Sequence, residues 1–193
     1  MKKKTLLITG AIIVIALYFL FQRPDYPDIN TPKPIFGNPG AKIRIEEFAD
    51  FECPACGSAH PTIKRVLEEF RENISYEFNH FPLSIHPNAQ KAAQAAECAN
   101  DQGRFYEYAD TLFANQDKLG TSSLKQYAKD LGLDAKSFNA CLDSGAKQKV
   151  VQGDQRKGLA RGVDSTPTIF INGKSIQSWQ YDSFKADVLK AMS

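Results

Sequence analysis

Two cysteines, Cys53 and Cys56, lie two residues apart in the segment FADFECPACGSAH, between a short apolar run and a long helical pattern. Cysteines at this spacing can bind a metal, form a structural disulfide or exchange disulfides with a substrate. Pro54 suits the first position of a helix, so a helix should begin directly after Cys53. The unpaired amides and partial positive charge of that helix end should stabilise a Cys53 thiolate. Cys56 lies one turn further on the same face, close enough to form a disulfide with Cys53.

The metal and structural alternatives explain the pair less well. Cys53, Cys56 and His60 follow the spacing C-x2-C-x3-H and offer three ligands, whereas a structural zinc site needs four and usually a second CxxC, which the sequence lacks. A disulfide across so short a loop would stabilise the fold little. The pattern therefore predicts thiol–disulfide exchange, in which one sulfur attacks and the other resolves the mixed disulfide. A metal-binding or chaperone module that uses C-x2-C-x3-H is the alternative of a different class.

Strands and a helix are predicted around the cysteine pair. Residues 41–48 alternate apolar and charged side chains, as a strand does, and residues 74–81 alternate again. Between these segments, apolar residues recur at helical spacing. Strand, helix and strand in this order predict a βαβ unit with a parallel pair of strands.

The remainder of the chain is first helical and then returns to strands. Residues 87–162 contain amphipathic and alanine-rich runs separated by glycines, with no strand signal. Residues 168–171 and 174–177 flank an Asn-Gly dipeptide, which is a strong hairpin signal. Residues 181–192 then form an amphipathic pattern. The predicted order is βαβ, helical insert, ββα.

The N-terminus predicts attachment to a membrane. Three lysines at positions 2–4 precede an uncharged, mostly apolar run at residues 5–21, which as a helix would nearly span a bilayer core. The run ends in bulky residues, so we expect an uncleaved signal anchor rather than a cleaved signal. The lysines should stay cytoplasmic, which places the rest of the chain on the usually oxidising side. Residues 23–39 contain five prolines and should form a stiff tether.

The charge distribution argues against one class of partner. The net charge of +2 includes the three N-terminal lysines, so the rest of the chain carries −1. A nearly neutral domain gives no electrostatic support for binding nucleic acid.

Together, three segments resemble the DsbA-like thiol–disulfide oxidoreductases of the thioredoxin superfamily. FADFECPAC resembles their strand-to-active-site segment, HFPL the end of the next strand, and GVDSTPTIFING their cis-proline loop and hairpin. The resemblance covers about Gly40 to the C-terminus. It implies an α/β thioredoxin fold with an inserted helical domain, preceded here by the N-terminal membrane anchor. The expected divisions are a signal anchor at 1–22, a tether at 23–39, a thioredoxin-like domain at 40–86 and 163–193, and the insert at 87–162.

The resemblance also implies roles for residues at matching positions. Cys53 is implied to be the nucleophile and Cys56 the resolving cysteine. Pro167 corresponds to the cis-proline that faces the disulfide, and Thr166 before it offers backbone groups to an extended substrate.

Glu47, six residues before Cys53, matches the buried acid of the family. Its strand parity supports this match independently, because Glu47 shares a face with Ile43 and Ile45 and should point toward the core. A carboxyl there could exchange a proton with Cys56. The alternative is an ordinary, solvated glutamate at the end of a strand.

Cys98 and Cys141 both fall in the helical insert. They are either two buried free thiols or a structural disulfide that joins two helices, as in some relatives, and we expect the disulfide. His60 shares the helix face of Cys56, so it either tunes the thiols or covers the site. Two further histidines, His80 and His86, are expected to have structural roles. Five aromatic residues are expected to pack in the core: Phe105, Tyr106, Tyr108, Phe113 and Trp179.

These observations predict a membrane-tethered dithiol oxidase that donates the Cys53–Cys56 disulfide to unfolded exported proteins. No cofactor is needed, because the cysteines carry the electrons. The resemblance implies a quinone-linked membrane reoxidase as partner. We expect a monomer in the cell membrane, single-pass, with its catalytic domain on the extracytoplasmic (periplasmic) side. The alternative enzyme is a thiol reductant in the same compartment.

Overall fold

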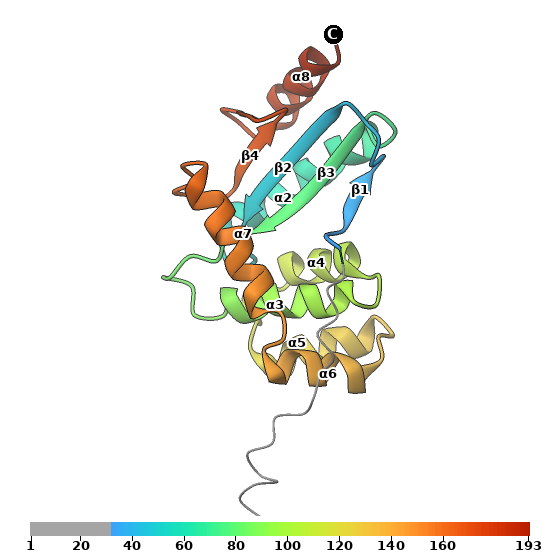
Figure 1. Ribbon diagram of the computed structural model, residues 1–193, viewed down its shortest axis with the longest axis vertical. Coiled ribbons are helices and arrows are strands. Elements are labelled where there is room, and N and C mark those ends of the chain that lie inside the picture. The colour runs from blue at the N-terminus through green and yellow to red at the C-terminus, as the bar shows by residue number, and fades with distance from the viewer. Residues whose placement is uncertain (1–31) are drawn as a thin grey trace, which may run out of the picture.

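The computed structural model describes residues 32–193, which form a sheet flanked by helices and a separate group of four helices (Figure 1). The expected membrane anchor, residues 1–22, and the first part of the expected tether lie outside the described residues. Within residues 32–193, no helix combines the length and the apolar character that crossing a membrane requires.

A five-stranded sheet with the order β1-β3-β2-β4-β5 forms the centre of the fold. Its strands are β1 (Ile35–Gly37), β2 (Ile43–Ala49), β3 (Ile74–His80), β4 (Thr168–Ile171) and β5 (Lys174–Ser175). β2 and β3 are parallel, which confirms the predicted βαβ unit, and the other neighbours are antiparallel. Asn172 and Gly173 turn the predicted hairpin with positive φ angles of 48° and 82°.

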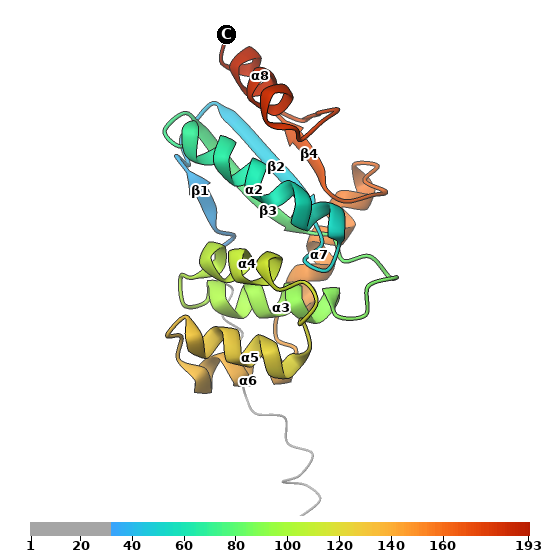
Figure 2. The same ribbon diagram turned by 180° about the vertical axis from the view of Figure 1, so that it is seen from behind.

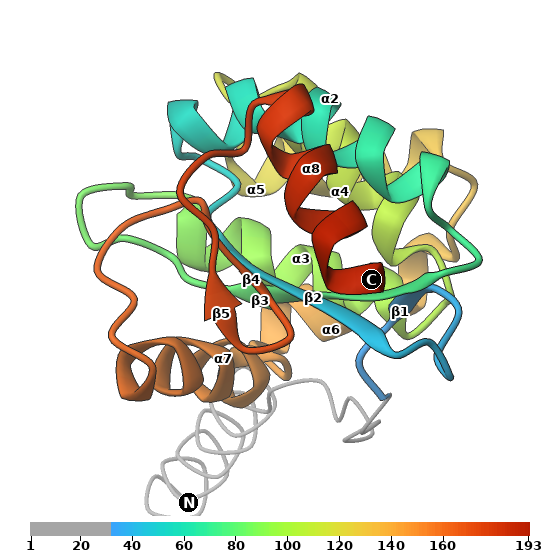
Figure 3. The ribbon, with the colours of Figure 1, turned by 90° about the horizontal axis from the view of Figure 1, so that it is seen from above.

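Helices cover both faces of this sheet. α2 (Pro54–Glu69) and α8 (Tyr181–Met192) pack together on one face, and α7 (Gln148–Ala160) packs on the other (Figure 3). The buried side of α2 consists of small and branched apolar residues: Cys56, Ala59, Ile63, Val66 and Leu67. This pattern explains why the segment forms a helix that lies along the sheet, as the view from behind shows (Figure 2).

The position of α7 adds a contact between the two expected domains. The sequence assigns residues 87–162 to one helical domain, and α7 packs both against α3 of that domain and against β3 of the sheet. Gly158 permits this close approach, because a Cβ atom there would lie 2.7 Å from the Phe81 ring and 2.9 Å from the Phe48 ring. The sequence pattern of α7 identifies a helix without identifying its partners, so its contact with the sheet was not predicted.

The rest of the helical domain consists of α3 (Ala89–Asn100), α4 (Phe105–Ala114), α5 (Thr121–Asp130) and α6 (Ala135–Ser144). These helices lie beyond the carboxyl ends of β2 and β3 (Figure 1). α3 is buried on nearly all sides, because its alanines allow α4, α5 and α6 to pack closely around it. A disulfide between Cys98 of α3 and Cys141 of α6 joins two of the four helices.

The N-terminal segment shows a second difference from expectation. Residues 35–37, assigned to the tether 23–39, form β1 and pair with β3. The Tyr106 hydroxyl also donates a hydrogen bond to the Pro34 carbonyl, 2.9 Å away. Nearby prolines conceal the strand in the sequence, but β1 is a short edge strand, where proline is tolerated. The folded domain thus includes β1 and does not begin at Gly40.

Candidate active site

The cysteine pair lies where β2 leads into α2. Cys53 is the N-cap of α2, in an extended conformation, and Pro54 occupies the first turn, as the sequence predicts. The Cys53 amide donates to the Asp50 carbonyl, 3.1 Å away. Both cysteines are reduced in this structure. The exposed fraction is 7% for Cys53 and 0% for Cys56, so Cys53 is the sulfur that a substrate can reach.

The two thiols have opposite acidities. The hydrogen bond from the Cys56 thiol is the largest cause that lowers the pKa of Cys53 to about 5; burial opposes it, while Thr166 and the amides of Cys56 and Ala55 assist it. The hydrogen bond with Cys53 and burial raise the pKa of Cys56. The sequence predicted that the helix amides would lower the pKa of Cys53, whereas in the structure the Cys56 thiol lowers it most. Near neutral pH, Cys53 is therefore a thiolate and Cys56 is a thiol.

The loop before β4 faces the cysteines. The bond between Thr166 and Pro167 is cis, and the Cys53 Sγ atom lies 3.5 Å from the Thr166 carbonyl oxygen. Phe48 of β2 is the register partner of Thr168, the first residue of β4, so the sheet fixes this loop beside the end of β2. The structure thus places Thr166 and Pro167 next to Cys53.

Glu47 lies in the interior, behind the cysteine pair. Its exposed fraction is 2%, which excludes the solvated alternative. The Tyr76 hydroxyl of β3 donates to Glu47 Oε2 over 2.5 Å. Burial raises the pKa of Glu47, although the Tyr76 hydrogen bond and the His60 charge act in the opposite direction. The charge of Glu47 contributes in turn to the raised pKa of Cys56, so the two groups interact electrostatically.

Gln116, which follows α4, is a site residue that sequence reasoning missed. Its side-chain amide donates to the carbonyls of Phe51 and Cys53, each at 2.8 Å. It fits because Gly57 has no side chain, since a Cβ at Gly57 would lie 2.0 Å from Gln116 Oε1. No local pattern marks a loop glutamine 63 residues from Cys53, and only the fold brings the two together.

His60 and His80 make their side-chain contacts away from the thiols. His60 Nε2 lies 2.7 Å from Asp110, and its ring stacks on Phe113 with centroids 4.4 Å apart. Its partners are therefore in the helical domain rather than at the cysteines. His80 is fully buried, with Nε2 bonded to Glu97 at 2.9 Å.

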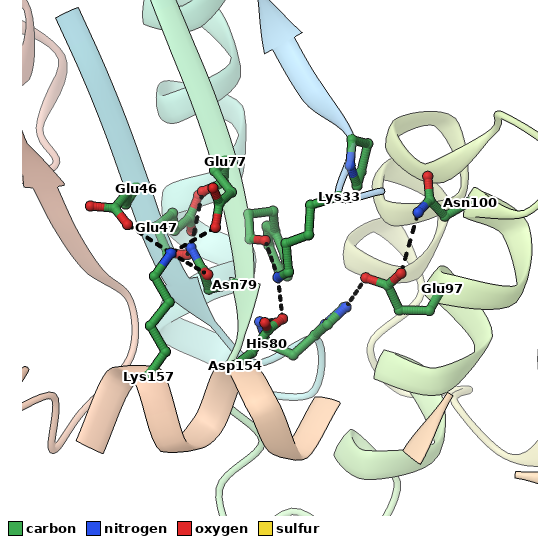
Figure 4. A network of polar contacts seen from close by, with 12 residues as sticks. Lys33, Glu46, Glu47, Glu77, Asn79, His80, Glu97, Asn100, Asp154 and Lys157 are labelled. Atoms are coloured by element: carbon green, nitrogen blue, oxygen red, sulfur yellow. Dashed lines mark hydrogen bonds and ion pairs between the residues drawn. The ribbon is translucent and has the colours of Figure 1, made fainter. Parts of the chain in front are cut away.

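One group of residues within 32–193 has spacing suited to a metal ion, and it does not include the cysteines. His80, Glu97 and Asp154 offer ligand atoms within 4.8 Å of one another. Figure 4 shows that the Lys33 side chain extends to this group of residues. Its ammonium pairs with Asp154 and donates a hydrogen bond to the Phe78 carbonyl. The lysine supplies a positive charge at this position, and the network joins the N-terminal segment to α7 and the sheet.

Solved structures of known proteins share this fold. BdbD from Bacillus subtilis matches with a TM-score of 0.73 and 24% identity, over 83% of this chain and 92% of that one. α-DsbA1 from Wolbachia pipientis matches at 0.72 and 21%, over 86% and 95%. MdbA from Corynebacterium diphtheriae, a thiol-disulfide oxidoreductase, matches at 0.68 and 21%, over 87% and 99%. At these identities, the likeness concerns the fold.

Curated relatives are more similar in sequence but much longer. The Na(+)/H(+) antiporter NhaA 3 of Salinispora tropica is 35% identical over 173 residues, which are 88% of this chain and 25% of the relative. NhaA 1 of Mycobacterium sp. (strain KMS) is 38% identical over 143 residues, 72% of this chain and 23% of the relative. The chain spans about a quarter of the length of these curated relatives.

A family model agrees with the fold. The model described as "Thioredoxin" matches residues 30–189, which is most of the chain. The resemblance to DsbA-like proteins that the CPxC and TPT segments predicted is confirmed for family and fold. The chain therefore belongs to the thioredoxin family.

Proposed function

We propose that this thiol–disulfide oxidoreductase is a dithiol oxidase, which donates its Cys53–Cys56 disulfide to cysteine pairs in other proteins. The observation that carries the proposal is the contrast between the lowered pKa of Cys53, about 5, and the raised pKa of Cys56. A stabilised Cys53 thiolate favours the reduced protein, so the disulfide gives up its bond readily.

The reaction has two steps. A substrate thiolate attacks Cys53, the accessible sulfur, and the disulfide breaks. Cys56 leaves with the electron pair and takes up a proton. Glu47 is the nearby carboxyl that can supply this proton. A second substrate thiolate then attacks the mixed disulfide, and Cys53 leaves as a thiolate. The substrate loses two electrons, the cysteine pair gains them, and no cofactor takes part.

The same proposal extends to the cellular setting. The N-terminal sequence supports an anchored protein with its catalytic domain on the extracytoplasmic side. We assign it the role of a monomer that acts on unfolded exported proteins. Continued turnover requires an oxidant for the reduced pair, and we assign this task to a quinone-linked membrane protein. Fractionation of cells that produce the full chain, followed by protease treatment from either side, tests the location.

The direction of exchange separates the oxidase from its alternative, a thiol reductant. The test is the equilibrium of the Cys53–Cys56 pair with glutathione. A reduction potential near that of a strong oxidase, about −120 mV, supports the proposal. A potential near that of thioredoxin, about −270 mV, would assign the protein to the reductants instead.

The order of attack can be tested with two variants. Cys53→Ser should abolish dithiol oxidation, whereas Cys56→Ser should accumulate mixed disulfides with substrate through Cys53. Alkylation of Cys53 in the reduced protein should remain rapid as the pH falls, until it drops near pH 5. Mass spectrometry identifies the modified sulfur, and preferential labelling of Cys56 at low pH would reverse the assignment.

The depressed pKa of Cys53 also has a consequence for stability. The thiolate stabilises the reduced fold fully above the unfolded thiol pKa of about 8.5. This contribution declines at lower pH and is lost as the pH falls through about 5.

A further inference from the structure

A loop from another part of the chain is attached to the segment that leads into the active site. The loop consists of residues 83–88, between β3 and α3. The Leu83 amide and His86 Nδ1 both bond to Asp50 Oδ2, at 2.8 and 2.7 Å. The backbone and side-chain amides of Asn88 donate to the Glu52 carboxylate, at 2.6 and 2.8 Å. Four hydrogen bonds thus fix the loop beside Cys53.

Asp50 places a carboxylate three residues before Cys53, in the turn that leads to it. Its side chain is completely buried, whereas that of His86 is 15% exposed. The Asp50 carbonyl accepts the hydrogen bond of the Cys53 amide, so Asp50 belongs to the turn that holds Cys53. An unbalanced carboxylate there would oppose formation of the Cys53 thiolate. His86 is the residue that balances it.

The surroundings of His86 favour its protonated form. Burial lowers its pKa, but the hydrogen bond and charge of Asp50 outweigh burial and raise it; the charges of Cys53 and Glu52 add to the increase. These three groups all come from the segment between β2 and α2. The 83–88 loop itself contributes no other charged side chain.

We propose that protonated His86, held by Asp50, is the cationic partner of the Cys53 thiolate and favours the reduced state of the active site. His86 does not react. When a substrate disulfide forms and Cys53 leaves with its electron pair, the imidazolium stabilises the sulfur's new charge and keeps its own proton. The inference deepens the proposed function and rests on Cys53 as the exchanging thiol, but not on the direction of exchange.

The first test uses the wild-type protein, so it does not depend on a variant that folds. NMR titration should give a higher His86 pKa in the reduced protein than in the disulfide form, because the disulfide carries no thiolate. His80, whose ring bonds to Glu97, is the internal reference. Equal His86 pKa values in the two redox states would refute the proposal.

The second test uses His86→Asn, which keeps an N–H donor for Asp50 but removes the charge. The Cys53 pKa, followed by the ultraviolet absorbance of its thiolate, should rise by about one unit. The equilibrium with glutathione should shift about tenfold toward the disulfide form. Asn88→Ala is the matched control, because it removes the side-chain hydrogen bond to Glu52, keeps the backbone one and leaves the His86 charge in place.

The outcomes separate a charge effect from a structural one. A shift in His86→Asn with little change in Asn88→Ala supports the proposal. An unchanged Cys53 pKa in His86→Asn, or equal shifts in both variants, would mean that the loop acts only as a support. Neither measurement requires an oxidase assay, so a wild-type protein that fails to oxidise dithiols overturns the proposed function and leaves the role of His86 to be decided separately.

Discussion

Glu46 and Glu47 are adjacent on β2, but their side chains lie on opposite faces of the sheet and their pKa values shift in opposite directions. Glu47 is buried, and burial raises its pKa. Glu46 lies on the other face; burial alone would raise its pKa as well, but Lys157 and Arg161 outweigh this and lower it. The two carboxyls should therefore make contributions of opposite sign to the pH dependence of stability.

Replacing Glu47 with glutamine should stabilise the reduced protein near pH 8, on the order of 1–3 kcal/mol, because an ionised carboxyl no longer has to be buried. The glutamine carbonyl can still accept the Tyr76 hydrogen bond. A raised folded-state pKa costs stability as the pH rises above the unfolded value of about 4.3, so the gain should vanish near pH 4. Urea unfolding at both pH values measures the effect.

Glu46→Gln is the matched control. Its pKa is lowered in the fold, so its contribution is present above the unfolded value and is lost as the pH falls through the folded one. The variant should lose on the order of 1 kcal/mol near pH 8. A Glu47→Gln variant that loses stability at this pH would contradict the interpretation of Glu47 as a buried acid.

Sequence analysis identified the site residues that belong to recognisable local patterns. The spacing of Cys53 and Cys56, the dipeptide Thr166-Pro167 and the strand parity of Glu47 all predicted positions that the structure brings together. Gln116 and His86 could not be identified in this way, because their contacts to the active-site segment cross 63 and 36 residues of chain. Such contacts depend on how whole elements pack, and no local periodicity encodes that packing.

At the scale of elements, Gly57 and Gln116 connect α2 to the segment after α4. Gly57→Ala should displace the Gln116 amide and destabilise the protein by about 1–2 kcal/mol, because the carbonyls of Phe51 and Cys53 lose their hydrogen bonds. In a Gln116→Ala background, the same change should be neutral or stabilise by about 0.5–1 kcal/mol, since alanine favours a helix.

Unfolding free energies of the four proteins form a double-mutant cycle. A Gly57→Ala effect that is the same in both backgrounds would show that Gln116 does not require the glycine. The Cys53 pKa, measured in parallel, reports whether the contact also positions the active site.

Elements with strong periodicity were predicted correctly, and those with weak signals were not. The alternation in β2 and β3 identified a parallel pair, and Asn-Gly identified the hairpin. β1 was missed because three residues beside prolines show no clear alternation. α7 was recognised as a helix, but its contact with the sheet was not predicted, because that contact depends on the small size of Gly158.

At the scale of the whole molecule, the disulfide between Cys98 and Cys141 closes a separation of 43 residues. Replacing both cysteines with alanine should lower the unfolding free energy by about 4 kcal/mol in the chain-entropy model. Denaturant unfolding of the variant against the wild type, each with the Cys53–Cys56 pair reduced, measures this loss. An unchanged midpoint would show that the packing of α3 and α6 suffices without the bond.

The two cysteine pairs also have a consequence for how the protein matures. Along the chain the order is Cys53, Cys56, Cys98 and Cys141, and each pair consists of consecutive cysteines. A chain that emerges with its N-terminus first presents the members of each pair one after the other. Joining each newly exposed cysteine to the one before it, whenever that one is unpaired, produces the native connectivity directly. Along that route the bonds require an oxidant, and no crossed bond has to be corrected.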